Sequence, residues 1–244
     1  MDNFARIRDL LGEDKAEAIA AVQVVIVGLG GVGSYAAEAL ARSGVGKMTL
    51  IDNDLIEASN INRQLIALES TLGQPKAEIM AQRLRDINSG IIINTHIQRI
   101  NEANQADLLV SGPDFVLDAI DDVAAKIALI SYCQSHGLEI ISSMGTANRL
   151  NPEALQVSVM QATHSCPLAQ KMRKLLRARQ VSLDFPVVFS TEATAHHPGQ
   201  HAGEHLGTMT FVPGTAGLYM AAAVVRKIIT GKYTYRRPDR KSVV

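Results

Sequence analysis

Cysteine and aromatic residues are scarce in this sequence, and neither sign of charge is in excess. The 244 residues include two cysteines, Cys133 and Cys166, no tryptophan, and 4% aromatic residues in total. Two thiols exclude a disulfide framework and a four-cysteine zinc site, and they are typical of a reducing cytosol. Because 24 Lys and Arg balance 24 Asp and Glu, a surface that binds a polyanion has to come from local clustering of charge.

Long apolar runs are missing as well. The N-terminal stretch MDNFARIRDLLGEDKAEAIAA is charged throughout, so no secretory signal is expected. The most apolar late stretch, residues 216–225 (AGLYMAAAVV), falls well short of the roughly 20 residues that cross a bilayer. We therefore expect a cytoplasmic protein without membrane insertion, in which residues 216–225 form a buried helix.

Short β-branched runs alternate with helical patterns through the first 145 residues. Strands are predicted at VQVVIVG, KMTLIDND, IIINTHIQRI, FVLDAID and LEIISSMG, and helices after Ser34 and at KAEIMAQRLRDIN and AAKIALISYCQSHG. This alternation predicts an α/β fold, a Rossmann-like, doubly wound and largely parallel sheet that is covered by helices. With 47% hydrophobic residues, the chain can build one sizeable core.

The pattern becomes less regular beyond Asn151. ALQVSVMQA and LGTMTFV (206–212) are predicted as strands and LAQKMRKLLRARQ as a basic helix, so this part adds strands and helices to the same unit. A polar loop at 196–205 carries histidines at four-residue intervals: His197, His201 and His205. Because glycines interrupt any helix there, a surface loop is favoured over a metal site.

Four glycines stand directly between a predicted strand and a predicted helix. Gly28, Gly30, Gly31 and Gly33 form G-x-G-G-x-G within VVIVGLGGVGSYAAEAL. Glycines let the backbone turn sharply and approach a phosphate, whose charge is favoured at a helix N-terminus. Asp52 ends the next strand, where a carboxylate can accept hydrogen bonds from ribose hydroxyls. The pattern predicts a nucleotide site; tight strand-to-helix packing without a ligand is the alternative.

Polar and cationic residues follow this turn. DNDLIEASNINRQLIALESTLGQPKAE supplies Asp54, Asn60, Arg63, Gln64 and Lys76. A nicotinamide dehydrogenase cradles pyrophosphate with backbone amides and has little use for an Arg and a Lys here. A triphosphate that is split needs cations to neutralise the charge that develops on it. The set therefore favours ATP, although any one of these side chains could be a solvated loop charge.

Acidic residues close the last predicted strand of this region. DAIDD places Asp118 and Asp121 at the carboxyl end of a strand, where such sheets bind ligands. A lone carboxylate beside a triphosphate would repel it, so we interpret Asp121 as a ligand of Mg²⁺.

These motifs, in this order and spacing, resemble the adenylating enzymes that activate ubiquitin and their bacterial relatives in molybdopterin and thiamin biosynthesis. The resemblance covers about residues 1–145. In that family a carboxylate attacks the α-phosphate of ATP and gives an acyl adenylate and pyrophosphate. The early FAR matches the family's arginine that crosses a homodimer interface, which nominates Arg6, with Arg8 nearby. The resemblance implies catalytic roles for Arg63, Lys76, Asp121 and Arg6, and ATP-binding roles for Gly28, Gly30, Gly31, Gly33, Asp52, Asp54, Asn60 and Gln64.

The C-terminal half narrows the resemblance to one branch. Members that charge sulfur-carrier proteins often have two Cys-x-x-Cys zinc pairs, and this sequence has none. SSMGTANRLNPEALQVS, CPLAQKMRKLLR and VVFSTEATAHHPG instead look like the tRNA threonylcarbamoyladenosine dehydratase branch. That branch uses ATP to activate the threonyl carboxylate of N6-threonylcarbamoyladenosine at position 37, in the anticodon loop of ANN-decoding tRNAs. The side chain then cyclises with loss of water.

That branch implies several partners and contacts. A homodimer and a tRNA are expected, and some family members' associations suggest a sulfur-transfer protein. By resemblance alone, FSTE supplies the substrate contacts Ser190, Thr191 and Glu192. The cations that could bind tRNA phosphates are Lys171, Arg173, Lys174, Arg177 and Arg179 in the basic helix and Arg236, Arg237, Arg240 and Lys241 in the tail. A solvated helix face and a frayed tail are the alternatives.

No enzyme nucleophile is required by this chemistry, because the substrate's carbamoyl group can attack the activated carboxylate intramolecularly. Cys133 is predicted to be a small core residue, and Cys166, expected in a loop, is the only candidate nucleophile. We expect residues 1–150 to form the ATP-binding adenylation region and residues 151–244 the substrate- and tRNA-binding portion.

Three other functions stay open at this point. The first is adenylation of the C-terminal glycine of a small sulfur-carrier protein, which an essential Cys166 would favour. The others are a nicotinamide oxidoreductase and a non-catalytic, nucleotide-sensing tRNA binder. The sequence does not decide between release of AMP and release of ADP.

Overall fold

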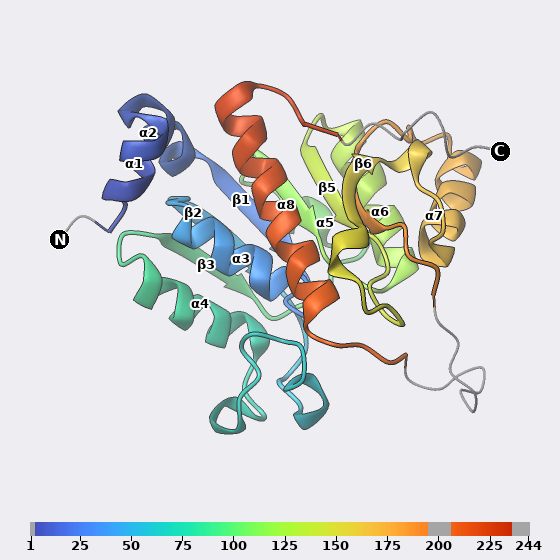
Figure 1. Ribbon diagram of the computed structural model, residues 1–244, viewed down its shortest axis with the longest axis horizontal. Coiled ribbons are helices and arrows are strands. Elements are labelled where there is room, and N and C mark those ends of the chain that lie inside the picture. The colour runs from blue at the N-terminus through green and yellow to red at the C-terminus, as the bar shows by residue number, and fades with distance from the viewer. Residues whose placement is uncertain (1–2, 195–205, 236–244) are drawn as a thin grey trace.

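A seven-stranded sheet runs through the centre of the computed structural model, which describes residues 3–194 and 206–235 (Figure 1). The strand order is β3-β2-β1-β4-β5-β7-β6, and all neighbours are parallel except the antiparallel pair β6 and β7. This arrangement confirms the predicted Rossmann-like fold. The strands are β1 (Gln23–Val27), β2 (Lys47–Ile51), β3 (Ile92–His96), β4 (Phe115–Asp118), β5 (Glu139–Ser143), β6 (Leu155–Val159) and β7 (Pro186–Ser190).

Helices cover both faces of the sheet. One face carries α3 (Gly33–Arg42), α4 (Lys76–Ile87) and α8 (Phe211–Thr230), and the other carries α5 (Gln105–Leu108), α6 (Val123–Ser135) and α7 (Pro167–Ala178). The short helices α1 (Ala5–Leu11) and α2 (Glu13–Ala21) precede β1 at the N-terminus. Both faces therefore need an apolar covering, which is why the central strands read as continuous apolar runs.

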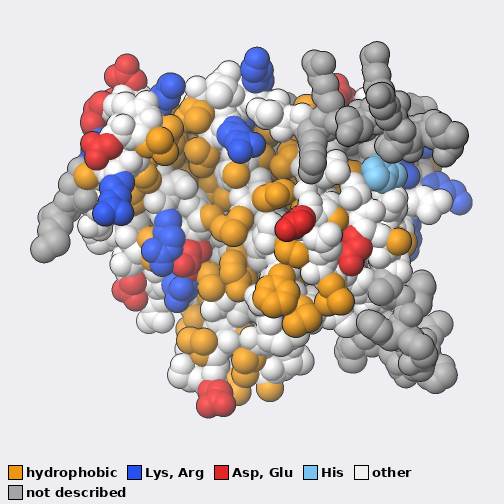
Figure 2. Space-filling view, viewed as in Figure 1, with side chains coloured by type: hydrophobic (Ala, Val, Ile, Leu, Met, Phe, Trp, Pro, Cys, Tyr) orange, Lys and Arg blue, Asp and Glu red, His pale blue; other side chains and the backbone are white. Residues whose placement is uncertain are grey.

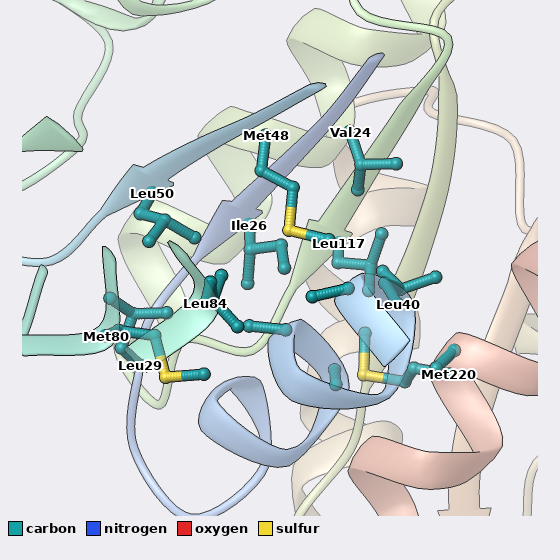
Figure 3. Close-up of a cluster of buried hydrophobic side chains, with 14 of the residues drawn as sticks. Val24, Ile26, Leu29, Leu40, Met48, Leu50, Met80, Leu84, Leu117 and Met220 are labelled. Atoms are coloured by element: carbon teal, nitrogen blue, oxygen red, sulfur yellow. The ribbon is translucent and has the colours of Figure 1, made fainter. Parts of the chain in front are cut away.

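Alternate residues of the central strands supply the two halves of the core. In β1, Val24 and Ile26 pack with Leu40 and Met220 on the α3 and α8 side (Figure 3), while Val25 faces the α6 side. All of these side chains are buried. The period of two in the strands thus divides one hydrophobic run between two clusters.

The predicted strand over residues 206–212 is wrong. Residues 206–209 have no regular structure, and α8 begins at Phe211. Val212, Ala216 and Met220 recur every four residues and are buried against the core, so helical packing overrides the β-branched appearance of TMTFV. A side chain at Gly217 would overlap the backbone of α3, so the close approach of the two helices requires glycine there.

Helix α8 is also longer than the apolar run that predicted it, since it spans 20 residues. By length and composition it is the one helix in residues 3–194 and 206–235 that could cross a membrane. Half of its most apolar window is buried inside the fold, however, where α8 packs against α3 and the sheet. This packing is that of a core helix, as expected for residues 216–225.

Candidate functional site

The glycine turn joins β1 to α3 at the carboxyl edge of the sheet. Gly28 has a φ of +88°, and a Cβ there would lie 2.7 Å from the carbonyl oxygen of Ala119. A Cβ at Gly33 would overlap the carbonyl of Gly28. No side chain of the described residues caps the N-terminus of α3, which leaves N–H groups of its first turn available to an anion. Gly28 and Gly33 thus serve the tight turn, and the turn presents a helix N-terminus as predicted.

Asp52 fastens this turn to the end of β2. Its Oδ2 accepts a hydrogen bond from the Leu29 N–H at 2.6 Å, and its Oδ1 accepts one from the Asp54 N–H at 2.8 Å. Burial raises the pKa of the Asp52 carboxyl, and the two backbone hydrogen bonds oppose that rise. Each carboxylate oxygen keeps a lone pair that can accept a hydroxyl, so the geometry is compatible with the predicted ribose contact.

Lys76 and Asp54 form an ion pair at the start of α4. Lys76 Nζ lies 2.7 Å from Asp54 Oδ2, and the lysine is 5% exposed whereas the aspartate is exposed. The backbone supports the pair, since the Lys76 N–H donates to the Asp54 carbonyl at 3.1 Å. Asp54 therefore holds Lys76, which is predicted to bind phosphate, at the sheet edge. The lysine can leave this carboxylate for a more highly charged anion.

The long crossover from β2 to α4 projects from this edge below α3 in Figure 1 and carries three further predicted residues. Arg63 packs beside the glycine turn, because a Cβ at Gly31 would lie 3.4 Å from Arg63 Cγ. Its guanidinium donates to the Ser59 carbonyl at 2.7 Å. Gln64 is buried, and its Oε1 has no hydrogen-bond partner among the described residues.

Asn60 plays a local part in the same crossover. It is buried at the end of η1 (Ala58–Asn60), and its Oδ1 accepts a hydrogen bond from the Glu57 N–H at 3.2 Å. Its carbonyl also accepts hydrogen bonds from the N–H groups of Arg63 and Gln64, at 3.1 and 2.9 Å. In this chain alone, Asn60 thus shapes the turn that presents its two neighbours to the glycines.

The three aspartates of DAIDD have three different environments. Asp118 is fully buried and paired with Lys126, at 2.9 Å. Asp122 caps α6 by accepting from the Ala125 N–H at 2.7 Å. Asp121 is exposed, and no described residue engages its carboxylate. Of the three, Asp121 is the carboxylate that no described residue engages, and its role as a ligand of Mg²⁺ stays a prediction.

Sequence reasoning missed the side chains that hold this acidic turn. Lys126 is fully buried in α6 and also donates to the Ile120 carbonyl at 2.9 Å. Ser142 of β5 donates its hydroxyl to Asp118 Oδ2 at 2.5 Å. The available signal was a single lysine inside the apolar helix pattern AAKIALI, since a charge buried in such a helix needs a partner.

The structure does not bring Arg6 to this site within one chain. Arg6 is exposed in α1, and the neighbouring Phe4 packs beside Gly44, in the loop that precedes β2. The glycine turn and Asp52 lie at the opposite, carboxyl end of the strands. An arginine of α1 that acts at such a site has to come from a second copy of the chain.

The two cysteines differ from each other. Cys133 is buried as predicted, and burial raises the pKa of its thiol to about 12, so it is not a nucleophile. Cys166 lies in the loop just before α7, as expected, but it is buried there as the N-cap residue of that helix, and its Sγ accepts the Ala169 N–H at 3.5 Å. A small, weakly polar side chain fits both the cap and the surrounding apolar cluster.

The C-terminal segment FSTE is occupied by contacts inside the chain. The Glu192 carboxylate accepts hydrogen bonds from the N–H groups of Leu150 and Asn151, at 3.0 and 2.9 Å. Ser190 accepts from the Glu192 N–H, and Thr191 donates to the Ala154 carbonyl. The histidines His197, His201 and His205 and the tail cations Arg236, Arg237, Arg240 and Lys241 lie outside the described residues.

Known proteins are similar to this chain, in sequence and in structure, over most of its length. A sequence model of the ThiF family matches residues 4–241. The tRNA threonylcarbamoyladenosine dehydratase of Bacillus subtilis is 35% identical over 94% of this chain and 95% of that protein. Crystal structures of E. coli tRNA N6-threonylcarbamoyladenosine dehydratase, TcdA, in complex with AMP and with ATP have TM-scores of 0.88 and 0.87 at 35% identity, each covering 94% of both chains.

A second type of adenylating enzyme matches a smaller share. Molybdopterin-synthase adenylyltransferase of Haemophilus influenzae is 34% identical, but over 69% of this chain and 67% of that protein. The dehydratases therefore account for more of the chain than the enzymes that serve a sulfur carrier.

Proposed function

This chain belongs to the ThiF family, and on that premise we propose that it is an ATP-dependent enzyme that dehydrates N6-threonylcarbamoyladenosine in tRNA. The observation that carries the proposal is the assembly of Lys76, Arg63 and the glycine turn at one sheet edge. The chain that contains this assembly is similar to such dehydratases over 94% of its length. The target is position 37 of ANN-decoding tRNAs, and the enzyme acts in the cytoplasm.

The residues present fit an adenine nucleotide. Gln64 Nε2 would lie 3.7 Å from a Cβ at Gly30, the Oε1 of the same side chain has no partner among the described residues, and Arg63 packs closely against Gly31. Buried polar atoms are rarely left without a partner, so Gln64 supports a ligand over the turn. We assign the phosphates to Gly28, Gly30, Gly31 and Gly33 with Asn60, Arg63 and Lys76, and the ribose to Asp52.

A carboxylate is a poor electrophile, because its charge repels nucleophiles and oxide is a bad leaving group. Its attack on the α-phosphate forms the acyl–phosphate bond and releases pyrophosphate. Lys76 and Arg63 then stabilise the charge that builds on the phosphates. The carbamoyl group attacks the activated carbonyl, loses a proton and expels AMP, which carries away the oxygen lost in dehydration. Proximity supplies about 7–11 kcal/mol in the best-oriented intramolecular reactions, so no enzyme nucleophile is needed.

Asp121 would hold Mg²⁺ at this edge. No group of three His, Cys, Asp or Glu side chains clusters as a metal site in residues 3–194 and 206–235, so the remaining ligands would be phosphate oxygens and water. Bound Mg²⁺ neutralises phosphate charge. The protein's part is to keep Asp121 in place through the turn that Lys126 and Ser142 fasten.

A second copy of the chain would complete the site. Exposed hydrophobic side chains form a band from α8 down to the crossover (Figure 2): Leu55, Ile61, Leu68, Leu72, Met209, Phe211 and Leu218. The two segments are joined, since Asn62 Nδ2 donates to the Thr208 carbonyl at 3.0 Å. Exposed apolar bands of this kind mark association surfaces, which supports a homodimer in which Arg6 serves the partner's site.

One experiment tests the proposal. The protein is incubated with ATP, Mg²⁺ and tRNA that carries the linear modification, and the digested nucleosides are weighed. A loss of one water from the modified nucleoside, with AMP and pyrophosphate as products, supports the proposal; ADP and phosphate would move the attack to the γ-phosphate. An unchanged nucleoside together with pyrophosphate exchange that depends on a sulfur-carrier protein would select the alternative activity.

A further inference from the structure

Helix α7 carries four cationic side chains and no acidic one, in a chain whose formal net charge is zero. The structure divides the basic cluster into two groups. Arg173 donates to the Thr163 carbonyl at 2.8 Å and to the Thr163 hydroxyl, and Arg179, just after the helix, pairs with Glu102 at 2.9 Å. Lys171, Lys174 and Arg177 are exposed, and no described residue forms an ion pair with them.

These three cations form a row. They are three residues apart, so they share one face of the helix and rise by about 4.5 Å from one to the next. With Pro167, Gln170 and Arg173 they line an open hollow of about 510 Å³. Basic side chains also show at the edge of the molecule over α7 (Figure 2). Like charges at this spacing repel each other, and an anion in the hollow would offset that repulsion.

The row starts at the edge of the sheet that holds the candidate site. Arg149 is 2% exposed and donates to the carbonyls of Gly145, just after β5, and Ser165, just before α7. This buried guanidinium thereby fastens the start of α7 to the carboxyl end of β5. Ligands of parallel sheets bind at that end, so an extended anion that enters the site can continue along α7.

We propose that Lys171, Lys174 and Arg177 bind the phosphodiester backbone of the tRNA anticodon arm; this inference rests on the proposed function. Flexible, unpaired cations neutralise phosphates without reading bases, and they position the nucleic acid. An anionic membrane is a poorer partner, because the apolar face of α7, with Ala169, Met172 and Leu176, is buried in the protein and cannot insert.

The test compares two charge-matched triple variants. One carries Lys171→Gln, Lys174→Gln and Arg177→Gln. The control carries Lys15→Gln, Lys47→Gln and Arg85→Gln, which are exposed on α2, β2 and α4 and lie outside the basic row. The dissociation constant of unmodified tRNA is measured over a range of salt concentrations, ATP binding reports intact folding, and dehydration gives KM and kcat.

We expect the α7 variant to bind tRNA at least about tenfold more weakly at physiological salt and to lose about 2 from the slope of log K against log salt. Its KM for tRNA rises, while kcat and ATP affinity stay those of the unsubstituted protein, and the control variant is unchanged throughout. Equal losses in both variants, or an unaltered slope in the α7 variant, overturn the inference. The inference is also overturned if the α7 variant loses binding to phosphatidylglycerol vesicles but still binds tRNA as the unsubstituted protein does.

The outcomes also separate this inference from the proposed function. If the unsubstituted protein dehydrates tRNA but the α7 variant binds tRNA equally well, the function stands and the surface is wrong. If the unsubstituted protein binds tRNA and never dehydrates it, the function is wrong, and the salt slope still decides the surface.

Discussion

Lys126 Nζ lies 2.9 Å from Asp118 Oδ1, and both side chains are fully buried at the carboxyl end of β4. The same ammonium group donates to the Ile120 carbonyl, so the pair fixes the turn that leads to Asp121. This turn also packs against the glycine loop, since Ala119 limits the space at Gly28. One buried ion pair thus sets the position of two parts of the candidate site.

Lys126→Met should destabilise the protein strongly, because it leaves the Asp118 carboxylate buried without its cation. Breaking one partner of a buried pair costs about 3–5 kcal/mol. The measurement is urea unfolding near neutral pH, with Lys126→Met/Asp118→Asn as the matched control that removes the buried charge. We expect the double variant to regain part of the lost stability. A loss below about 1 kcal/mol in the single variant, the level of an exposed pair, would contradict the prediction.

Gly33→Ala should disrupt the nucleotide turn, because the new Cβ overlaps the carbonyl of Gly28. Forced overpacking typically costs about 1–3 kcal/mol, and the displaced turn should weaken ATP binding at least tenfold. Gly30→Ala is the control for stability, since only the flexible end of Gln64 comes near its Cβ, at 3.7 Å. Thermal unfolding and ATP titration check both variants; equal melting temperatures would show that the turn yields without cost.

Lys76→Ala should separate activity from stability. Its partner Asp54 is exposed and can be solvated after the change, so the loss of stability should be about 1 kcal/mol or less. Turnover with ATP should fall by about 10²–10³-fold, which is the usual effect of removing one group that stabilises developing charge. Lys47→Ala, at the amino end of β2, is the control. Full turnover in Lys76→Ala would return the site to the oxidoreductase interpretation.

Acid should weaken nucleotide binding through Asp52. Burial raises the pKa of this carboxyl, so the folded protein takes up a proton at a pH where the unfolded chain is still ionised. Protonation thus relieves the cost of burying Asp52, and acid does not unfold the protein through this group. A ribose hydroxyl, however, donates to the ionised form, so ATP affinity should fall as pH drops through the raised pKa.

The comparison with Asp52→Asn isolates this effect, because the titration of ATP itself is the same for both proteins. Calorimetric titration at several pH values gives the ratio of the two dissociation constants. We expect the unsubstituted protein to bind more tightly near neutral pH and the ratio to approach one in acid. A ratio that is constant with pH would mean that Asp52 has no ionised contact with the nucleotide.

The sequence pattern predicted the sheet because β1, β4 and β5 are buried on both faces, so each of them appears in the sequence as a short continuous apolar run. It failed at residues 206–212, where contacts with α3 decide between strand and helix. At the site, the turn from β1 into α3 could be predicted from residue type and order, whereas the phosphate-binding role of Lys76 stays a prediction. Lys126 and Arg149 could not, because their partners are brought together only by the folded sheet.

The position of Arg6 leads to a prediction about two copies of the chain. Arg6 lies in α1, near the amino ends of the strands, and the candidate site lies at their carboxyl ends. If the chain forms the homodimer proposed above, Arg6→Ala and Lys76→Ala should therefore each inactivate it, one by removing a group from the partner's site and the other by removing a group from its own. In a mixed dimer, the chain with Arg6→Ala keeps its own Lys76 and receives Arg6 from its partner.

Mixing the two inactive proteins, after unfolding and refolding together, should thus restore dehydration to about a quarter of the normal rate, because half of randomly formed dimers are mixed and each has one complete site. The control mixes Arg6→Ala with the double variant Arg6→Ala/Lys76→Ala, in which no site can be complete. Failure of the first mixture to recover would place both residues in the same site or remove Arg6 from catalysis. Normal turnover by Arg6→Ala alone would show that Arg6 takes no part in catalysis. Lys76 and Arg63 would then be the cations that act on the phosphates.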